Sequence, residues 1–173
     1  MPDFILTERL HLRPYAAADF PALQALHCQV AVSRWLGDGQ VPEDGQIQAR
    51  LAEYCRPRPA PQGVYAITLR MAPERALGTL LLLALPLSAG EAAGYQPELE
   101  IGWHLHPDYW GKGYATEAAR AVLAAAPDLT QVYAVTYPEN QASQAVMRRL
   151  DMTEIGLSRR YYDTELLLFG KVL

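Results

Sequence analysis

The chain has 173 residues, about the length of a single domain with its own hydrophobic core. Half of the residues are hydrophobic and a fifth are charged, which excludes a disordered chain and is typical of a soluble globular protein. The net charge of −4, without any basic stripe, predicts that no nucleic acid is among the partners.

Cysteine usage and hydropathy predict a cytoplasmic protein. Cys28 and Cys55 fit neither a metal-binding spacing nor a redox pair, so we expect reduced thiols and no metal. The first residues lack a secretion signal, and the most apolar run, 76–87, is far shorter than the ~20 residues of a membrane span. We therefore expect one domain over residues 1–173 and no membrane partner.

Hydrophobic periodicity predicts strands and helices that alternate without internal repeats. In chain order we expect a strand over 9–15, helices over 19–30 and 42–55, strands over 64–71, 76–87 and 98–106, a helix over 114–126, a strand over 131–137, a helix over 140–150, and strands over 153–161 and 165–172. This order predicts one α/β domain around a mixed sheet. Asp19 is expected to cap the first helix, and the link 88–97 to be mobile and to rim a site.

The stretch YWGKGYATEA leads into a helix through two glycines. Because no Ser, Thr, Asp or Asn stands at the helix start, its first N–H groups are open to an anion such as phosphate. Gly111 and Gly113 permit positive φ, and Lys112 adds a positive charge. Thr116 occupies the place of the third glycine of G-x-G-x-x-G, which disfavours a nucleotide-binding protein. A turn without any ligand is an equal alternative, since Glu117 could neutralise the helix dipole itself.

The strand before this turn, ELEIGWHLH, has one polar face. Alternation places Glu100, His104 and His106 on that face, together with Gly102. Glu100 is a candidate general base, with a pKa that rises if the cleft is dry. The alternatives are a solvated sheet face for Glu100 and a structural or exposed role for each histidine, because no third ligand completes a metal site.

The helix after residue 139 begins with a polar first turn. Asn140 is expected to accept a hydrogen bond from the N–H of Ser143, and this cap alone is a sufficient explanation for Asn140. Both side chains could also reach a ligand at the end of the preceding strand. The helix is expected to bury one apolar stripe: Ala142, Val146 and Leu150.

Three stretches together resemble the GNAT family of N-acetyltransferases, and within it the branch of ribosomal-protein N-terminal acetyltransferases (the RimJ and RimL type). They are TERLHLRP (7–14), EIGWHLHPDYWGKGYATEA (100–118) and NQASQAVMRRLDM (140–152). The second is similar to the family's acetyl-CoA motif, with Trp110 in the place of an Arg or Gln and with Gly113 and Ala115 after it. The resemblance implies an α/β GNAT fold, in which a mixed, mostly antiparallel sheet of about seven strands is flanked by about four helices and two splayed strands hold acetyl-CoA.

The resemblance also implies acetyl-CoA as the co-substrate. The turn at 111–116 would bind its pyrophosphate, pantetheine would lie along 103–106, and a main-chain N–H near Leu105 would polarise the acetyl carbonyl. The implied cofactor-binding residues are Trp103, His104, Leu105, His106, Trp110, Gly111, Lys112, Gly113, Tyr114, Ala115, Thr116, Asn140 and Ser143.

The implied reaction is direct attack of an amine on the thioester in a ternary complex. Glu100, Ser143 and Asn140 are the expected catalytic residues. Glu100 would take the amine proton, directly or through water, and Ser143 would protonate the thiolate, because Met147 stands where many relatives have a tyrosine. Tyr162 and its neighbour Tyr161 could line the acceptor cleft or merely pack.

The leading hypothesis is an N-acetyltransferase whose acceptor is a primary amine, on a protein N-terminus or a small molecule. Its pocket would come from the loops 36–45 and 88–97, which do not specify one acceptor. The alternative is a non-catalytic acyl-CoA-binding or regulatory module, which the missing tyrosine permits and the retained Glu100, Asn140 and Ser143 disfavour. We expect a monomer or a homodimer.

Overall fold

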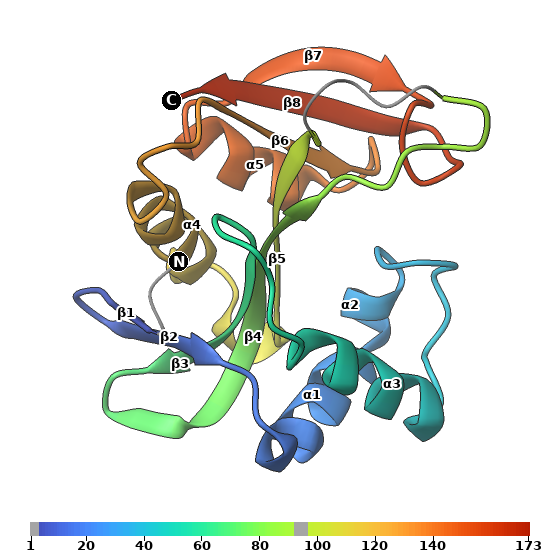
Figure 1. The fold of residues 1–173 in the computed structure, drawn as a ribbon. Coiled ribbons are helices and arrows are strands. Elements are labelled where there is room, and N and C mark those ends of the chain that lie inside the picture. Colours follow the sequence, from blue (N-terminus) through green and yellow to red (C-terminus); the bar gives the residue numbers. More distant parts are fainter. Residues whose placement is uncertain (1–3, 92–96) are drawn as a thin grey trace.

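The computed structural model describes residues 4–91 and 97–173, and these residues form one mixed sheet of eight strands (Figure 1). The strands are β1 (Ile5–Leu6), β2 (Leu10–Pro14), β3 (Gly63–Leu69), β4 (Ala72–Ala84), β5 (Leu99–Leu105), β6 (Gln131–Thr136), β7 (Thr153–Ser158) and β8 (Leu166–Val172). Their order in the sheet is β1-β2-β3-β4-β5-β6-β8-β7. Neighbouring strands are antiparallel except β5 and β6, which run parallel.

Helices cover both faces of this sheet. In the described residues they are α1 (Phe20–His27), α2 (Val30–Ser33), α3 (Asp44–Tyr54), α4 (Tyr114–Ala124) and α5 (Gln141–Arg149). In Figure 1, α1, α2 and α3 lie together on one side of the central strands, and α4 lies on the other. Alternation along β3 supplies both cores, since Val64 and Ala66 pack with α1 and α3, whereas Tyr65 and Ile67 join the cluster that includes α4 and α5.

The parallel junction between β5 and β6 positions the site, because the two strands diverge from it. The two strands pair where Glu100 of β5 lies opposite Tyr133 of β6. Toward its other neighbour, β5 keeps a regular ladder with β4 from Leu99 to Leu105. The end of β5 therefore has a paired edge toward β4 and an open edge toward β6.

The structure confirms the predicted α/β class and most of the predicted elements, with local corrections. The helix expected over 19–30 is divided into α1 and α2 by Cys28 and the extended Gln29. Asp19 does not cap α1 with its side chain. Its carboxylate instead accepts a hydrogen bond from the N–H of Ala16 at 2.9 Å and two from the guanidinium of Arg13 at 2.7 and 2.8 Å. These bonds occupy the oxygens that a cap of α1 would need.

The prediction of an apolar stripe on α5 is also partly wrong. Leu150 is buried, but Ala142 is exposed and lines a cleft. Gln144 is buried in its place, because its side-chain amide donates to the carbonyl of Pro138 at 2.7 Å. Part of the link expected to be mobile, 92–96, lies outside the described residues. No helix in the described residues is long and apolar enough to cross a membrane.

Candidate active site

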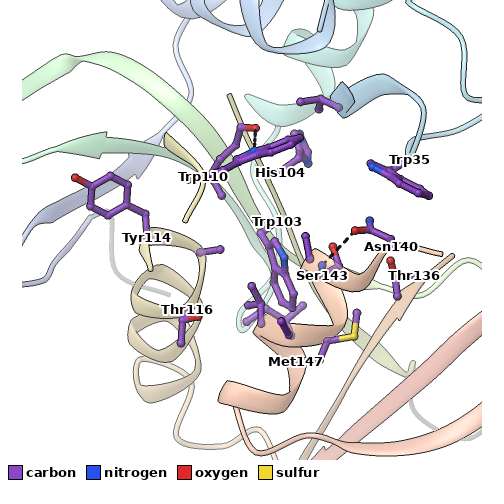
Figure 2. A pocket seen from close by; sticks show the side chains of 18 of the residues that line it. Trp35, Trp103, His104, Trp110, Tyr114, Thr116, Thr136, Asn140, Ser143 and Met147 are labelled. Atoms are coloured by element: carbon purple, nitrogen blue, oxygen red, sulfur yellow. Dashed lines mark hydrogen bonds between the residues drawn. The ribbon is translucent and has the colours of Figure 1, made fainter. Parts of the chain in front are cut away.

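A cleft of about 1880 Å³ opens where β5 and β6 diverge. Figure 2 shows Trp103, Ser143 and Met147 in its middle, with Thr116 and Tyr114 of α4 on one side and Trp35 on the other. All of the predicted site residues except His106 line it: Glu100, Trp103, His104, Leu105, Trp110, Gly111, Lys112, Gly113, Tyr114, Ala115, Thr116, Asn140 and Ser143.

His106 is not among the residues that line the cleft. Its Nδ1 accepts a hydrogen bond from the N–H of Asp108 at 3.4 Å and lies 3.5 Å from the carboxylate of the same residue. The ring therefore caps the short turn Pro107–Tyr109.

The glycine turn has the open geometry that its sequence predicts. Gly111 and Gly113 have φ values of +73° and +80°, and Gly113 precedes α4 without any side-chain cap. The hydroxyl of Thr116, in the first turn of α4, is buried and has no hydrogen-bond partner among the described residues. Uncapped N–H groups and an unpaired hydroxyl at one helix start fit an oxyanion such as phosphate.

Arg9 also contacts this turn, although no local sequence pattern predicts that contact. Its guanidinium donates to the carbonyl of Lys112 at 2.9 Å and forms an ion pair with Glu117 at 2.6 Å. Burial would raise the pKa of Glu117, but hydrogen bonds from Thr7 and Arg9 outweigh it and lower that pKa. Glu117 is therefore engaged by Arg9 and Thr7, and Arg9 adds a positive charge beside the open helix start.

The open edge of β5 presents main-chain groups to the cleft. The N–H of His106 donates to Leu77 of β4, and the pairing partners alternate along an antiparallel ladder. Trp103 and Leu105 consequently direct their N–H and C=O groups away from β4, toward the gap. The indole of Trp110 donates to the Leu105 carbonyl at 2.7 Å (Figure 2). Trp110, which stands where the acetyl-CoA motif has an Arg or Gln, thus has a structural contact at the end of the open edge of β5.

Glu100 lies where β5 and β6 meet, with 8% of its surface exposed. Burial raises its pKa to about 7, although the hydrogen bond from Tyr162 opposes this rise. That bond is short, at 2.5 Å between the phenolic oxygen and Oε2. A carboxylate with such a pKa can exchange a proton near neutral pH.

Tyr162 reaches Glu100 from a strained turn between β7 and β8. Tyr162 and Asp163 have φ values of 60° and 52°, a conformation that L-residues rarely adopt. The turn is held by Ser88, whose hydroxyl accepts from the N–H of Asp163 at 2.9 Å. Tyr161, by contrast, is buried, donates to Glu98 and does not line the cleft.

The start of α5 forms the remaining wall. Asn140 accepts a hydrogen bond from the N–H of Ser143 at 3.2 Å, so the predicted cap is present. Ser143 also lines the cleft, one turn before the buried thioether of Met147. A hydroxyl is thus available where the methionine offers no proton donor.

A family model described as an acetyltransferase (GNAT) domain matches residues 9–153 of this chain. The matched segment runs from the residue before β2 to the first residue of β7. It contains the diverging strands β5 and β6 and the helices α4 and α5 beside the cleft.

Curated proteins with similar sequences include two uncharacterized N-acetyltransferases of Bacillus subtilis. YnaD is 39% identical over 64 residues, which are 35% of this chain and 38% of that protein. YoaA is 24% identical over 158 residues, which are 90% of this chain and 85% of that protein. The chain thus aligns with less than half of YnaD and with most of YoaA.

Solved structures with this fold include a GNAT acetyltransferase from Bacillus anthracis, with a TM-score of 0.79, 21% identity and 98% coverage of both chains. The ribosomal-protein acetyltransferase RimL in complex with coenzyme A has a TM-score of 0.73, 19% identity and 98% coverage of both chains. These two likenesses concern the fold. The family match over residues 9–153 confirms the predicted family, and the chain belongs to the GNAT acetyltransferases.

Proposed function

We propose that this protein transfers the acetyl group of acetyl-CoA to a primary amine by direct attack in a ternary complex. One observation carries the proposal: the uncapped start of α4 and the open edge of β5 face the same cleft as the buried carboxylate of Glu100. The occurrence of coenzyme A in the similarly folded RimL agrees with it.

The residues at one end of the cleft fit the coenzyme. The N–H groups after Gly113 and the unpaired hydroxyl of Thr116 bind the pyrophosphate, and Arg9 and Lys112 contribute positive charge. The open edge from Trp103 to Leu105 binds the pantetheine amides as an added strand would.

The remaining residues manage charge and protons. When bound, acetyl-CoA supplies an activated thioester. The N–H of Leu105 stabilises the negative charge that develops on the acetyl oxygen. Glu100 accepts the proton that the attacking amine releases, and Ser143 donates a proton to the departing sulfur and recovers one from water.

The test separates binding from catalysis. Thermal unfolding with acetyl-CoA, coenzyme A or ATP is expected to show stabilisation by the first two. Release of the coenzyme A thiol is then followed over a panel of amines and short peptides. Stabilisation without turnover of any amine would favour the non-catalytic acyl-CoA-binding module, and a response to ATP alone would contradict the proposal.

Thr116→Val tests the proposed pyrophosphate site. Valine has nearly the same shape and removes a buried hydroxyl that lacks a partner, so the stability of the free protein should not fall. The KM for acetyl-CoA is expected to rise by roughly tenfold, since a hydrogen bond to a charged group is lost. An unchanged KM would remove Thr116 from the site.

A further inference from the structure

The part of the cleft lined by α3 and β5, which we call its acceptor end, contains a cation without an acidic partner among the described residues. Arg50 and Tyr54, one turn apart on α3, both line the cleft. Arg50 is half-buried and forms no ion pair with a carboxylate of the described residues. Its Nη1 lies 2.9 Å from Nδ1 of His27 in α1. A guanidinium in this position is available to an anion that enters the cleft.

Two histidines pack beside Arg50, and one of them, His104, lines the cleft with it. Because a guanidinium only donates, Nδ1 of His27 accepts the hydrogen bond and the ring proton lies on Nε2. The His27 ring packs edge-on against His104 of β5, with centroids 5.1 Å apart. The Nε2 atoms of both rings are buried and have no partner among the described residues. Of the two rings, only His104 is among the described residues that line the cleft, and His27 is fully buried behind it. Buried polar atoms are normally hydrogen-bonded, so Nε2 of His104 fits a polar group of a ligand.

The two imidazoles beside Arg50 add no positive charge of their own at neutral pH. Burial, and then the nearby charge of Arg50, lower the pKa of His27 to about 4. Burial also lowers the pKa of His104 well below its ordinary range, with smaller effects from His27 and Arg50. Both imidazoles are neutral at pH 7. A second cation, Arg34, lies over the ring of Trp35 at 4.5 Å, and both residues also line the cleft.

The strand geometry sets the spacing between the recess at Arg50 and the proposed base. Glu100 and His104 project from the same face of β5 and are four residues apart, which corresponds to ~13 Å along the strand. Arg50 lies near the His104 end, through His27. The recess at Arg50 and the N–H of Leu105, where the acetyl oxygen is proposed to bind, therefore lie at the same end of β5, and Glu100 lies toward the other end.

We propose that the acceptor is a small amine that carries a carboxylate, and that Arg50 binds this carboxylate while the amine lies at the acetyl carbon near Leu105 and Glu100 takes its proton, directly or through water. This inference rests on the proposed acetyl transfer and names its substrate class. Planar carboxylates match the paired donors of a guanidinium, and a site built for such a group rejects the analogue that lacks it. An ω-amino carboxylate and a short peptide with a free C-terminus share this chemistry.

The experiment compares each acid with its amide. The acceptors are glycine, β-alanine, 4-aminobutyrate, 6-aminohexanoate and glycylglycine, each beside its C-terminal amide, with thiol release as the signal. The acids should exceed their amides by roughly tenfold or more in kcat/KM, at the chain length that fits best between Arg50 and the acetyl group. The glycylglycine pair distinguishes a peptide from an ω-amino carboxylate as the source of the carboxylate.

Variants of Arg50 test whether this residue causes the preference for acids over amides. Arg50→Gln should raise the KM for the acids by roughly tenfold and abolish the preference over amides, whereas Arg50→Lys should retain part of it. The matched control is Arg56→Gln, because Arg56 follows the same helix, is exposed and lies outside the cleft lining. Unfolding temperatures of all variants are measured, and the KM for acetyl-CoA should stay unchanged.

Two results would overturn the inference: no acid that exceeds its amide, or a preference that survives in Arg50→Gln. Stabilisation by acetyl-CoA, measured on the same samples, shows whether the proposed function stands independently of this result. If acetyl-CoA does not stabilise the wild-type protein, the proposed function itself is wrong.

Discussion

Two adjacent tyrosines contact two carboxylates of one segment, and this allows a matched test at the scale of single residues. Tyr162 donates to Glu100 inside the cleft, and Tyr161 donates to Glu98 outside its lining. A hydrogen bond to the ionised carboxylate favours ionisation, so its loss raises the pKa of Glu100 further above about 7.

Tyr162→Phe is therefore expected to move the acidic limb of the kcat/KM profile to higher pH, by about one unit, and to lower activity at neutral pH. Activity should require the ionised Glu100, so the profile of the wild type should rise through pH 7. Tyr161→Phe should leave the limb in place. If both variants shifted the profile equally, or neither did, the bond to Glu100 would have no role in tuning the base.

At the scale of helices and strands, some parts of the site can be predicted from short stretches of sequence and others cannot. The glycine turn, the polar face of β5 and the cap of α5 were predictable, because each depends on residues within one turn or strand of one another. The two-residue strand β1 and the four-residue helix α2 were not, since each is too short to display a period.

Other site residues depend on long-range topology. Arg9 reaches α4 only because the N-terminal segment lies beside that helix in the fold, and Arg50 reaches the cleft only because α3 covers one face of the sheet. Tyr162 was named as a possible cleft residue, but its bond to Glu100 requires the left-handed turn after β7. No local pattern encodes these three placements.

The attachment of the N-terminal segment to α4 gives a prediction at the scale of elements. Arg9 connects Lys112 and Glu117, so Arg9→Gln should loosen the segment and remove a positive charge beside the glycine turn. The KM for acetyl-CoA is expected to rise by roughly three- to tenfold with little change in kcat. Arg159→Gln is the control, because its pair with Glu165 is exposed and outside the cleft lining. Equal effects of the two variants on this KM would contradict a role for Arg9.

The stability of the whole molecule carries the signature of Glu100. Its pKa is about 7 in the folded state and about 4.3 in an unfolded chain, so between these values only the folded state holds the proton. The free energy of unfolding therefore falls as pH rises through this window, by about 3 kcal/mol from this group. His27 and His104 act in the opposite direction below pH ~6.5, because they stay neutral in the folded state.

Glu100→Gln isolates this contribution, since the histidines are the same in both proteins. The variant should gain stability relative to the wild type as pH rises from 4.5 to 7.5, by about 3 kcal/mol over the interval. Urea unfolding at a series of pH values measures the difference. A difference that stays constant across the series would mean that the carboxylate is ionised in the folded protein at low pH.

The divergence of β5 from β6 also divides the chain in the order of its synthesis. The strands β1 to β5 end at residue 105, and the strands β6 to β8 begin at residue 131. The antiparallel pairs from β1 to β5 can thus form while the ribosome is still adding the rest of the chain. Glu100 would remain without its phenolic partner until residue 162 has left the exit tunnel. A nascent chain that ends before residue 131 is thus expected to contain the strands β1 to β5 and a Glu100 that lacks its hydrogen bond from Tyr162.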